Sequence, residues 1–339
     1  QTSCGACHEG AARGPGLVQK MAVVEADGVT PAPAPDQSSK LPYGATVHPL
    51  LAAGAKTPIT PPPNDPSIKV SIRIGPPLLG RGYMEAILDS EIERVAAEQA
   101  SRSDGIHGRV NRVTYASEEN PDKRFHQHKK GDNVIGRFGL KARIATLDDF
   151  VADAFQGDMG ITSPLRPSEI ANPDNLTDDI KPGVDVGIDS VNKRALYIRY
   201  IAIPRRPAAS DPAAIRGRTL FDQAKCQVCH TPSMKTRPDY PIALLSNIDA
   251  PIFADLLLHD MGTALADGTP SGTDGDGSAT SRTWRTSPLI GLRFLRTYLH
   301  DGRAKTIHDA ILMHDGPGSE ASESAKAYAS MNGADQQSL

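Results

Sequence analysis

The four cysteines of the chain occur as two copies of one short motif. Cys4-Gly5-Ala6-Cys7-His8 lies at the start, Cys226-Gln227-Val228-Cys229-His230 lies in the second half, and no cysteine is left over. A Cys-x-x-Cys-His unit is the attachment site of c-type haem: the two thiols add to the vinyl groups, and the histidine binds the iron. The spacing suits this chemistry because one helical turn separates the sulfurs and places the imidazole below the ring. The sequence therefore predicts two covalently bound haems c, attached by Cys4, Cys7, Cys226 and Cys229, with His8 and His230 as axial ligands.

Two other kinds of site use the same residue types. Cysteines and histidines of two zinc half-sites could combine into tetrahedra, but zinc does not need a histidine directly after the second cysteine in both copies. A thioredoxin-like disulfide follows a strand in a βαβ unit, a pattern that this sequence does not show. Haem is attached outside the cytoplasm, which predicts a periplasmic or otherwise exported protein. Gln1 is not an initiator and no signal peptide precedes it, so the chain is processed or the sequence lacks its beginning.

The amino-acid composition excludes further classes of protein. The 339 residues suffice for about two domains, and 30 glycines with 28 prolines indicate many turns and loops. Aromatic residues make up only 5%, so a large apolar cofactor could help to fill the cores. The net charge of −3 excludes a strongly basic nucleic-acid-binding protein, and no apolar run is long enough to span a membrane.

The pattern of elements predicts a mostly α-helical protein with two cytochrome c-like haem domains, long loops and little β structure. Residues 11–66 are proline-rich, which favours a loop insertion that wraps over the surface. Alternating apolar residues predict a strand over 68–74, and helical spacing predicts a helix over 84–100. A proline-rich linker separates the N-terminal haem domain, 1–207, from the C-terminal haem domain, 208–339.

An internal repeat links the two predicted domains. Gly139-Leu140-Lys141-Ala142 precedes a helix predicted to begin at Thr146, and Asp301-Gly302-Arg303-Ala304 precedes one predicted to begin at Thr306. Each helix carries a Thr-x-x-Asp capping box, which satisfies free amides of the first turn. Each domain therefore supplies a haem-attachment unit and a capped helix.

The two capped helices differ at their far ends. In the second, Ile307, Ile311 and His314 fall on one apolar face, so His314 could reach the second iron. In the first, Asp158 ends the equivalent stripe, and a buried carboxylate is costly unless it is paired or used. A carboxylate is a poor iron ligand, so the first iron would keep an open coordination position. On spacing alone, Asp158 could equally face solvent near Gly160, and His314 could equally be a core histidine.

Further segments carry specific motifs: Arg73-Ile74-Gly75-Pro76-Pro77-Leu78-Leu79-Gly80, Gly157-Asp158-Met159-Gly160, Leu258-His259-Asp260-Met261-Gly262, Trp284-Arg285-Thr286-Ser287-Pro288-Leu289 and Tyr298-Leu299-His300-Asp301-Gly302-Arg303-Ala304. With both haem units in the same order, the chain resembles a family of bacterial di-haem oxidoreductases regarded as peroxidases. That family is related to di-haem cytochrome c peroxidase and to the methylamine-utilisation di-haem enzyme. The resemblance runs from about Leu41 to the end of the chain. It implies a peroxide-binding N-terminal haem and an electron-transferring C-terminal haem.

The resemblance also implies roles for individual residues. Asp158-Met159-Gly160 matches the Glu-Met-Gly of the peroxidases, which makes Asp158 the distal acid over the peroxide-binding iron. His314 matches the distal ligand of the electron-transfer haem, which is Met in the peroxidases and Tyr in the methylamine-utilisation enzyme. Phe138 replaces a Trp between the haems, which argues against a Trp-mediated relay. Leu295 replaces a Thr at their calcium site, so a bound calcium is left open.

Several other residues are candidates for supporting roles. Met159 could bind the first iron in a resting state, and His259 or Met261 could bind the second, although a structural role for His259 is favoured. Trp284 is most simply a core aromatic beside the second haem. Basic side chains could pair with haem propionates or lie in solvent. The residues expected near the haems are Met159, Phe138, Lys141, His259, Met261, Trp284, Arg285, His300 and Arg303, whereas loop or surface positions are expected for His48, His107, His126 and His128.

These observations predict a di-haem c-type enzyme that reduces hydrogen peroxide or a similar oxidant, or uses it to oxidise a substrate. Asp158 would move a proton between the peroxide oxygens. The C-terminal haem, held by His230 and His314, would exchange electrons with a redox partner protein or a small donor. Two nitrogen ligands lower the potential relative to His/Met ligation, which favours oxidation of another substrate over plain cytochrome c peroxidase activity. The alternatives are a di-haem electron-transfer cytochrome without peroxidase activity and an interaction protein with relic haems.

Overall fold

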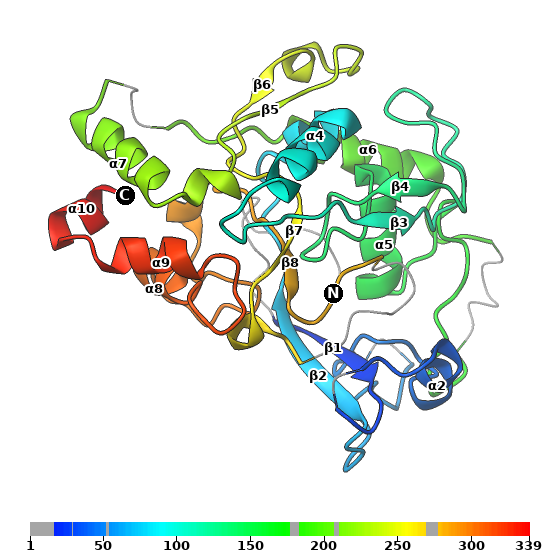
Figure 1. Ribbon diagram of the computed structural model, residues 1–339. Helices are drawn as coiled ribbons and strands as arrows, with labels where there is room; N and C mark the ends of the chain where they lie inside the picture. The colour runs from blue at the N-terminus through cyan, green and yellow to red at the C-terminus, as the bar shows by residue number, and fades with distance from the viewer. Residues whose placement is uncertain (1–16, 29, 52–53, 177–182, 207–209, 269–276) are drawn as a thin grey trace.

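Helices are the main regular elements of the computed structural model, which describes residues 17–339 except 29, 52–53, 177–182, 207–209 and 269–276 (Figure 1). The α-helices are α2 (Ala34–Lys40), α3 (Arg81–Ala86), α4 (Asp89–Ala100), α5 (Leu147–Met159), α6 (Ile188–Tyr200), α7 (Pro212–Gln223), α8 (Ile307–Leu312), α9 (Ser322–Ala329) and α10 (Gly333–Ser338). Short 3₁₀ turns are η2 (Cys226–Val228), η3 (Ala243–Leu245), η4 (Thr263–Leu265) and η5 (Leu292–Phe294). The described sheets are all two-stranded. The described residues thus combine helices with small two-stranded sheets, so the prediction of a mostly α-helical protein is confirmed only in part, and two cytochrome c-like domains remain a prediction.

The longest strands form an antiparallel pair, β1 (Leu17–Val23) with β2 (Ile68–Ile74), in which Leu17 pairs with Ile74. The strand predicted over 68–74 is thus confirmed. Its partner was not predicted, because 17–23 was assigned to a proline-rich loop. Residues 17–23 contain no proline, and Met21 and Val23 are buried in a small core of their own. The other pairs are β3 (Arg112–Thr114) with β4 (Asn133–Ile135), β5 (Met234–Lys235) with β6 (Asp249–Ala250), and β7 (Leu258–Asp260) with β8 (Thr283–Arg285).

The helix predicted over 84–100 is interrupted between α3 and α4. Ile87 and Leu88 are extended, each with φ −60° and ψ 136°. The buried Arg137 guanidinium donates to the carbonyls of Glu85 at 3.1 Å and Ile87 at 2.8 Å, and Ile87 pairs with Thr236. Tertiary partners therefore take the backbone groups that a continuous helix would use.

The largest hydrophobic core draws on residues from both sides of the predicted boundary at 207. Phe138, Leu147 and Val191 share it with Met234 and Ile252, all fully buried. Within this body α5 packs against α6. The division into two domains remains a prediction. In the described part of the chain, no helix combines the length and hydropathy needed to cross a bilayer.

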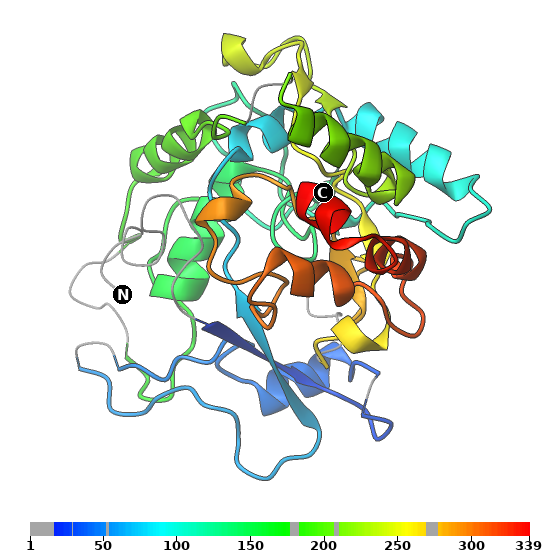
Figure 2. The same ribbon diagram turned by 90° about the vertical axis from the view of Figure 1, so that its left-hand side faces the viewer.

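The helix that leads into the second haem unit is held by the C-terminal helix. Figures 1 and 2 show α7 beside α10, and Arg216 and Asp335 form an ion pair between them at 2.8 Å. The helices approach at Gly217, where a Cβ would lie 2.1 Å from the carbonyl oxygen of Ser338. This contact fixes the helix that immediately precedes Cys226.

Candidate haem sites

The second Cys-x-x-Cys-His unit forms the tight turn that haem attachment requires. Cys226 begins η2, and the amide of His230 donates to the carbonyl of Cys226 at 2.9 Å. The two cysteines are not joined in a disulfide. Burial raises the pKa of the Cys226 thiol to about 11 and also raises the pKa of Cys229. The sulfurs are therefore neither a disulfide nor reactive thiolates.

His230 is oriented by one backbone contact. Its Nδ1 lies 3.1 Å from the carbonyl oxygen of Phe253. Because a carbonyl can only accept, Nδ1 carries the hydrogen, and the unprotonated Nε2 is the atom that can bind iron. Burial lowers the pKa of His230 to about 4, with a smaller contribution from His314, so the ring is neutral. Phe253 and Leu256 are non-glycine residues with φ of 50° and 63°, a strained conformation that is typical of functional sites.

His314 is oriented in the same way. It lies in the turn after α8, and its Nδ1 is 2.6 Å from the carbonyl oxygen of Ala310, which again leaves Nε2 as the ligand atom. The Ser319 hydroxyl donates to the His314 carbonyl at 2.7 Å. Burial lowers the pKa of His314 as well. Two cysteines on one turn and two neighbouring neutral imidazoles fit a haem c with two histidine ligands.

The apolar face expected for α8 differs from the observed one. The helix ends at Leu312, so His314 lies beyond it, and Ile307 is 44% exposed. Leu312 and Met313 are also exposed. A helix of six residues cannot carry a stripe that spans the eight residues from Ile307 to His314. Apolar surface left open beside a potential iron ligand is surface that a haem could cover.

The first haem unit, Cys4, Cys7 and His8, lies outside the described residues. The acid predicted to serve it, Asp158, stands at the end of α5. The predicted start of this helix is confirmed, since Thr146 caps it by accepting from the Asp149 amide. Leu147 and Val151 are buried as expected, but Asp158 is exposed in the last turn, which extends past the core.

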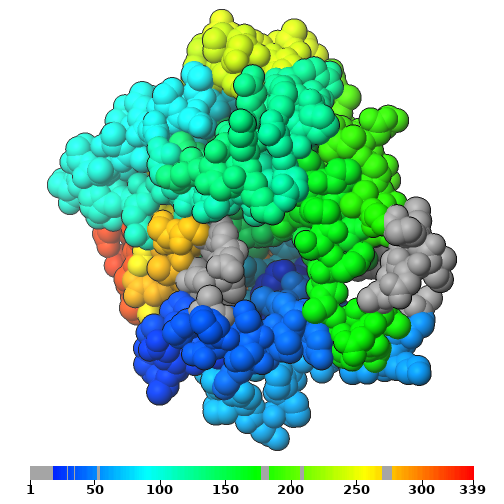
Figure 3. Space-filling view, turned by 90° about the vertical axis from the view of Figure 1, so that its right-hand side faces the viewer, coloured from blue at the N-terminus to red at the C-terminus, as the bar shows by residue number. Residues whose placement is uncertain are grey.

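Asp158 nevertheless interacts with a charged cluster that the sequence did not reveal. Partial desolvation of the carboxyl group raises its pKa. The positive charge of Lys20 opposes this rise, the negative charge of Asp153 adds to it, and Arg143 and His48 oppose it. Lys20 lies on β1 and its ammonium donates to Thr46 at 2.5 Å. On the face in Figure 3, the blue N-terminal segment borders the green segment that contains α5 and α6.

His48 lies in a loop, which agrees with its expected loop or surface position, but it also interacts with this cluster. It is half-buried, and burial together with the charge of Lys20 lowers its pKa. Lys20 and His48 are more than a hundred residues from Asp158 in sequence, so no local pattern could have paired them with it. Met159 is half-buried and packs against the main core.

His259 is buried and bonded through both ring nitrogens. Its Nε2 is 2.9 Å from Asp255 Oδ2 and its Nδ1 is 2.7 Å from Glu320 Oε2, with Cys229 Sγ 3.6 Å from Nδ1. This arrangement favours the structural role over iron binding. Cys229, Asp255 and His259 also offer three ligand atoms within 4.8 Å of one another. Neither Cys226 nor His230, which the zinc alternative requires, belongs to this group. Met261 is half-buried and pairs through its backbone with Ser319.

The remaining candidates gather around Trp284, which is buried and donates from Nε1 to the Leu265 carbonyl at 2.9 Å. His300 stacks on the indole at 3.9 Å between ring centroids, and burial lowers the pKa of His300 to about 4. The Lys141 ammonium lies 3.4 Å from the indole centroid. Two groups this close to the indole cannot both lie on the same face of it, so the His300 ring and the Lys141 ammonium lie on opposite faces. Phe138 is fully buried and stacks on Phe150 at 5.9 Å.

Three of the basic residues expected near propionates bond to protein groups. Lys141 donates to the carbonyls of Thr280 and Thr283, both at 2.7 Å. Arg285 is buried and donates to the carbonyl of Gly139 at 2.9 Å, and burial lowers its pKa to about 10. Arg303 is exposed and pairs with Asp301 at 2.5 Å. Lys141 and Arg285 thereby join the turn at 139–142 to β8.

Comparison with known proteins gives the family. Residues 62–339 match a family model described as "di-haem oxidoreductase, putative peroxidase". No curated protein matches the chain. Among solved structures, the hydrazine synthase of Kuenenia stuttgartiensis, studied under xenon pressure, is similar over 76% of this chain and 71% of its own, with 17% identity and a TM-score of 0.35. That likeness is too low to carry an argument. The family model spans most of the sequence, and the chain therefore belongs to the di-haem oxidoreductase family.

Proposed function

We propose that the protein is a peroxidase-like di-haem c oxidoreductase, which reduces peroxide or uses it to oxidise a substrate. The N-terminal haem, attached through Cys4 and Cys7 with His8 on its iron, would be the reaction site. The C-terminal haem, attached through Cys226 and Cys229, would be held by His230 and His314. The observation that carries this proposal is the pair of neutral imidazoles, His230 and His314, each fixed through Nδ1.

Asp158 supplies the proton transfer in this proposal. A bound haem iron would supply the site at which peroxide binds and its O–O bond breaks. The Asp158 carboxylate takes the proton from the oxygen nearer the iron and returns it to the departing oxygen, so it ends in its starting state. A carboxyl pKa above its usual range suits both halves of this transfer. The exposure of Asp158 gives peroxide and water access to it.

The C-terminal site exchanges electrons in this scheme. His314 as sixth ligand would close that iron to peroxide, and two nitrogen ligands would keep its potential low. A redox partner protein or a small donor would supply or accept the electrons. Since haem is attached outside the cytoplasm, we place the protein in the periplasm or another exported location.

The test is the substitution Asp158→Ala in the holoprotein. Loss of general acid/base help is expected to slow the reaction with hydrogen peroxide by about 10²- to 10⁴-fold in stopped-flow measurements. Haem content and the spectrum of the second haem should not change. The matched control is Asp222→Ala, which removes another exposed carboxylate from a helix end, where it pairs with Arg218 at 3.1 Å. Asp158→Glu, one methylene longer, should keep part of the rate.

The exposure of Asp158 favours one alternative function, an electron-transfer cytochrome. In that protein both irons would be six-coordinate and Asp158 would be incidental. An unchanged peroxide rate in Asp158→Ala, together with a spectrum that stays fully low-spin after partial reduction, would establish this alternative over the peroxidase.

A further inference from the structure

The buried triad of Asp255, His259 and Glu320 contacts the second haem-attachment unit. Asp255 and His259 are almost fully buried, and Glu320 is half-buried. The His259 ring spans the two carboxylates at 2.9 and 2.7 Å, and its Nδ1 lies 3.6 Å from the sulfur of Cys229. None of the three residues has a part in the proposed peroxide chemistry, so the triad needs another explanation.

The charge of the triad follows from its geometry. Each nitrogen of His259 faces a carboxylate oxygen, which can only accept, so both nitrogens carry hydrogen and the ring is a cation. Interactions with Cys229 and then with Asp255 raise the pKa of His259 well above its usual range although burial opposes this, and the cation keeps the pKa values of Asp255 and Glu320 low. Two anions and one cation leave the triad with one net negative charge, and its His259 ring lies against the attachment sulfur.

The triad also joins the segments that carry both proposed axial ligands. The amide of Asp255 donates to the Cys229 carbonyl at 3.0 Å, in the strained loop whose Phe253 carbonyl orients His230. Glu320 follows Ser319, whose hydroxyl holds the His314 carbonyl. The triad is therefore tied to both the proximal and the distal side of the site.

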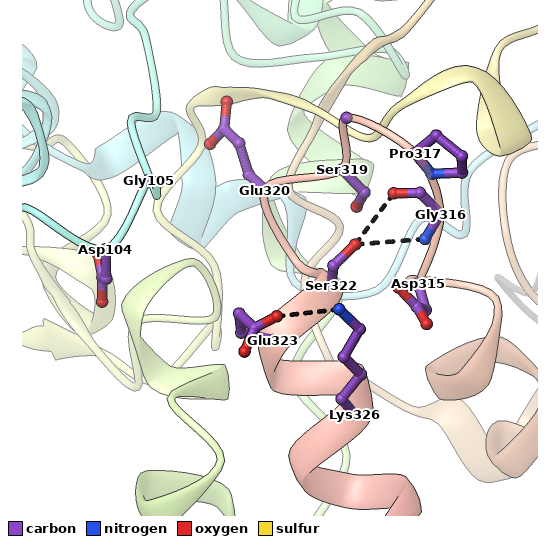
Figure 4. Close-up of a pocket in the computed structure, with 11 residues that line it drawn as sticks. Asp104, Gly105, Asp315, Gly316, Pro317, Ser319, Glu320, Ser322, Glu323 and Lys326 are labelled. Carbon is purple, nitrogen blue, oxygen red and sulfur yellow. Dashed lines mark hydrogen bonds and ion pairs between the residues drawn. The ribbon is translucent and has the colours of Figure 1, made fainter.

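Residues of the N-terminal half close the network. The Gln99 amide donates at 2.8 Å to both Asp255 and the Val228 carbonyl, and the amide of Gly108 donates to Gln99 at 2.8 Å. A Cβ on Gly108 would lie 2.7 Å from Nε2 of His259. The close approach of backbone to the ring keeps water away from it. Of the three triad residues, only Glu320 lines the neighbouring cavity of about 620 Å³ (Figure 4).

We propose that the Asp255–His259–Glu320 triad sets the reduction potential of the second haem. This inference rests on the proposed binding of that haem by His230 and His314. The two carboxylates favour the oxidised haem because it carries one more positive charge, and the His259 cation limits their effect. These residues are positioning residues, since none of them touches peroxide or the iron. Burial strengthens the interaction, because charges in a poorly solvated site are weakly screened.

The experiment is potentiometric titration of the holoprotein, following the low-spin haem by its absorbance. His259→Gln removes the cation and should lower the potential of the second haem. Glu320→Gln and Asp255→Asn each remove an anion and should raise it, Asp255→Asn more because it is fully buried; the remaining carboxylate keeps His259 protonated. Each change is expected to alter the ratio of reduced to oxidised haem, at a fixed applied potential, by on the order of tenfold.

The control is Glu323→Gln. Glu323 lines the same cavity, but its carboxylate bonds to Lys326 at 3.0 Å and not to the triad (Figure 4). Its substitution should leave the potential unchanged. Opposite shifts in His259→Gln and Glu320→Gln support the proposal. If His259→Gln does not fold, a raised potential in Glu320→Gln, absent from Glu323→Gln, supports it.

Two results would overturn the inference and leave the proposed function standing. One is a low-spin second haem whose potential is the same in Glu320→Gln as in Glu323→Gln. The other is a shift in the same direction when either the cation or an anion is removed, which is the result of a purely structural defect. By contrast, a protein with no covalent low-spin haem at Cys226 and Cys229 would contradict the proposed function itself.

Discussion

Two regions of the molecule share one local architecture and then diverge. In the first, Phe138 and Ile144 form a β-bridge that closes a turn, and Thr146 caps α5. In the second, Tyr298 and Ala304 form the bridge, and Thr306 caps α8. Each bridge or cap residue of the second region lies 160 positions after its counterpart in the first. The repeat recognised in the sequence is therefore a repeat in three dimensions as far as the first helical turn.

Beyond that turn, the two regions carry side chains with different chemistry. With the same offset, His314 corresponds to Ala154, whose methyl group cannot bind a metal. The first helix, α5, continues for another turn to Asp158. By contrast, α8 ends at Leu312, and the carbonyl of Ala310 orients His314 by accepting from its Nδ1. One supporting architecture thus presents a histidine in one copy and an acid in the other. It predicts a closed second haem and an open first haem.

The largest expected effect concerns the haems themselves, since the comparison requires one in each region. The denatured protein should have a mass excess of two haems, because thioether bonds survive denaturation. Cys226→Ala combined with Cys229→Ala should lose one haem and retain the one at Cys4 and Cys7. Mass spectrometry with metal analysis makes the measurement. Stoichiometric zinc in place of haem would show that the two regions are not haem sites.

The second prediction separates the closed site from the open one. His314→Gly should convert the second haem from low-spin to high-spin and allow exogenous imidazole to restore the low-spin spectrum. The control is His308→Gly, which removes a histidine of α8 whose Nδ1 lies 2.9 Å from the Tyr328 hydroxyl. It should leave the absorption spectrum unchanged. A low-spin spectrum that persists in His314→Gly but is lost in His259→Gly would show that another histidine is the ligand.

Local features of this fold could be predicted from the sequence because they depend on neighbours in the chain. The turn at Cys226, the strand over 68–74 and the caps at Thr146 and Thr306 are each specified within a few residues. The partner strand 17–23 was missed, because its pairing requires a segment about fifty residues away. The break at Ile87 was missed for the same reason, since it depends on Arg137.

The candidate sites divide in the same way. Motifs indicated His230, His314 and Asp158, but not the groups that set their protonation. Glu320 lies in an exposed-looking polar stretch, and only the fold brings it to His259. Lys20 belongs to a segment that composition assigned to a loop. Charge–charge interactions between distant segments leave no periodicity, so they become visible only with the structure.

The smallest expected effect tests the charged cluster around Asp158, the residue that is proposed to serve an open first haem. The groups that influence Asp158 are Lys20, Arg143, Asp153 and His48. The positive charge of Lys20 lowers the pKa of Asp158, so Lys20→Met should raise that pKa further. If the carboxylate form starts the proton transfer, the rate with peroxide falls as pH decreases through this pKa. The fall should therefore begin at a higher pH in Lys20→Met than in the unmodified protein.

A pH series of the peroxide rate measures this displacement. At a fixed acidic pH, Lys20→Met is expected to react a few-fold more slowly, which is far less than the loss in Asp158→Ala, and at alkaline pH the two rates should converge. Lys193→Met is the matched control, because Lys193 is an exposed lysine on α6 that does not contribute to the pKa of Asp158. Loss of rate that is equal at every pH would show that Lys20 supports the fold of the site and does not tune the acid. A displacement towards lower pH would exclude the carboxylate as the proton acceptor, because removing a nearby cation cannot make an acid stronger.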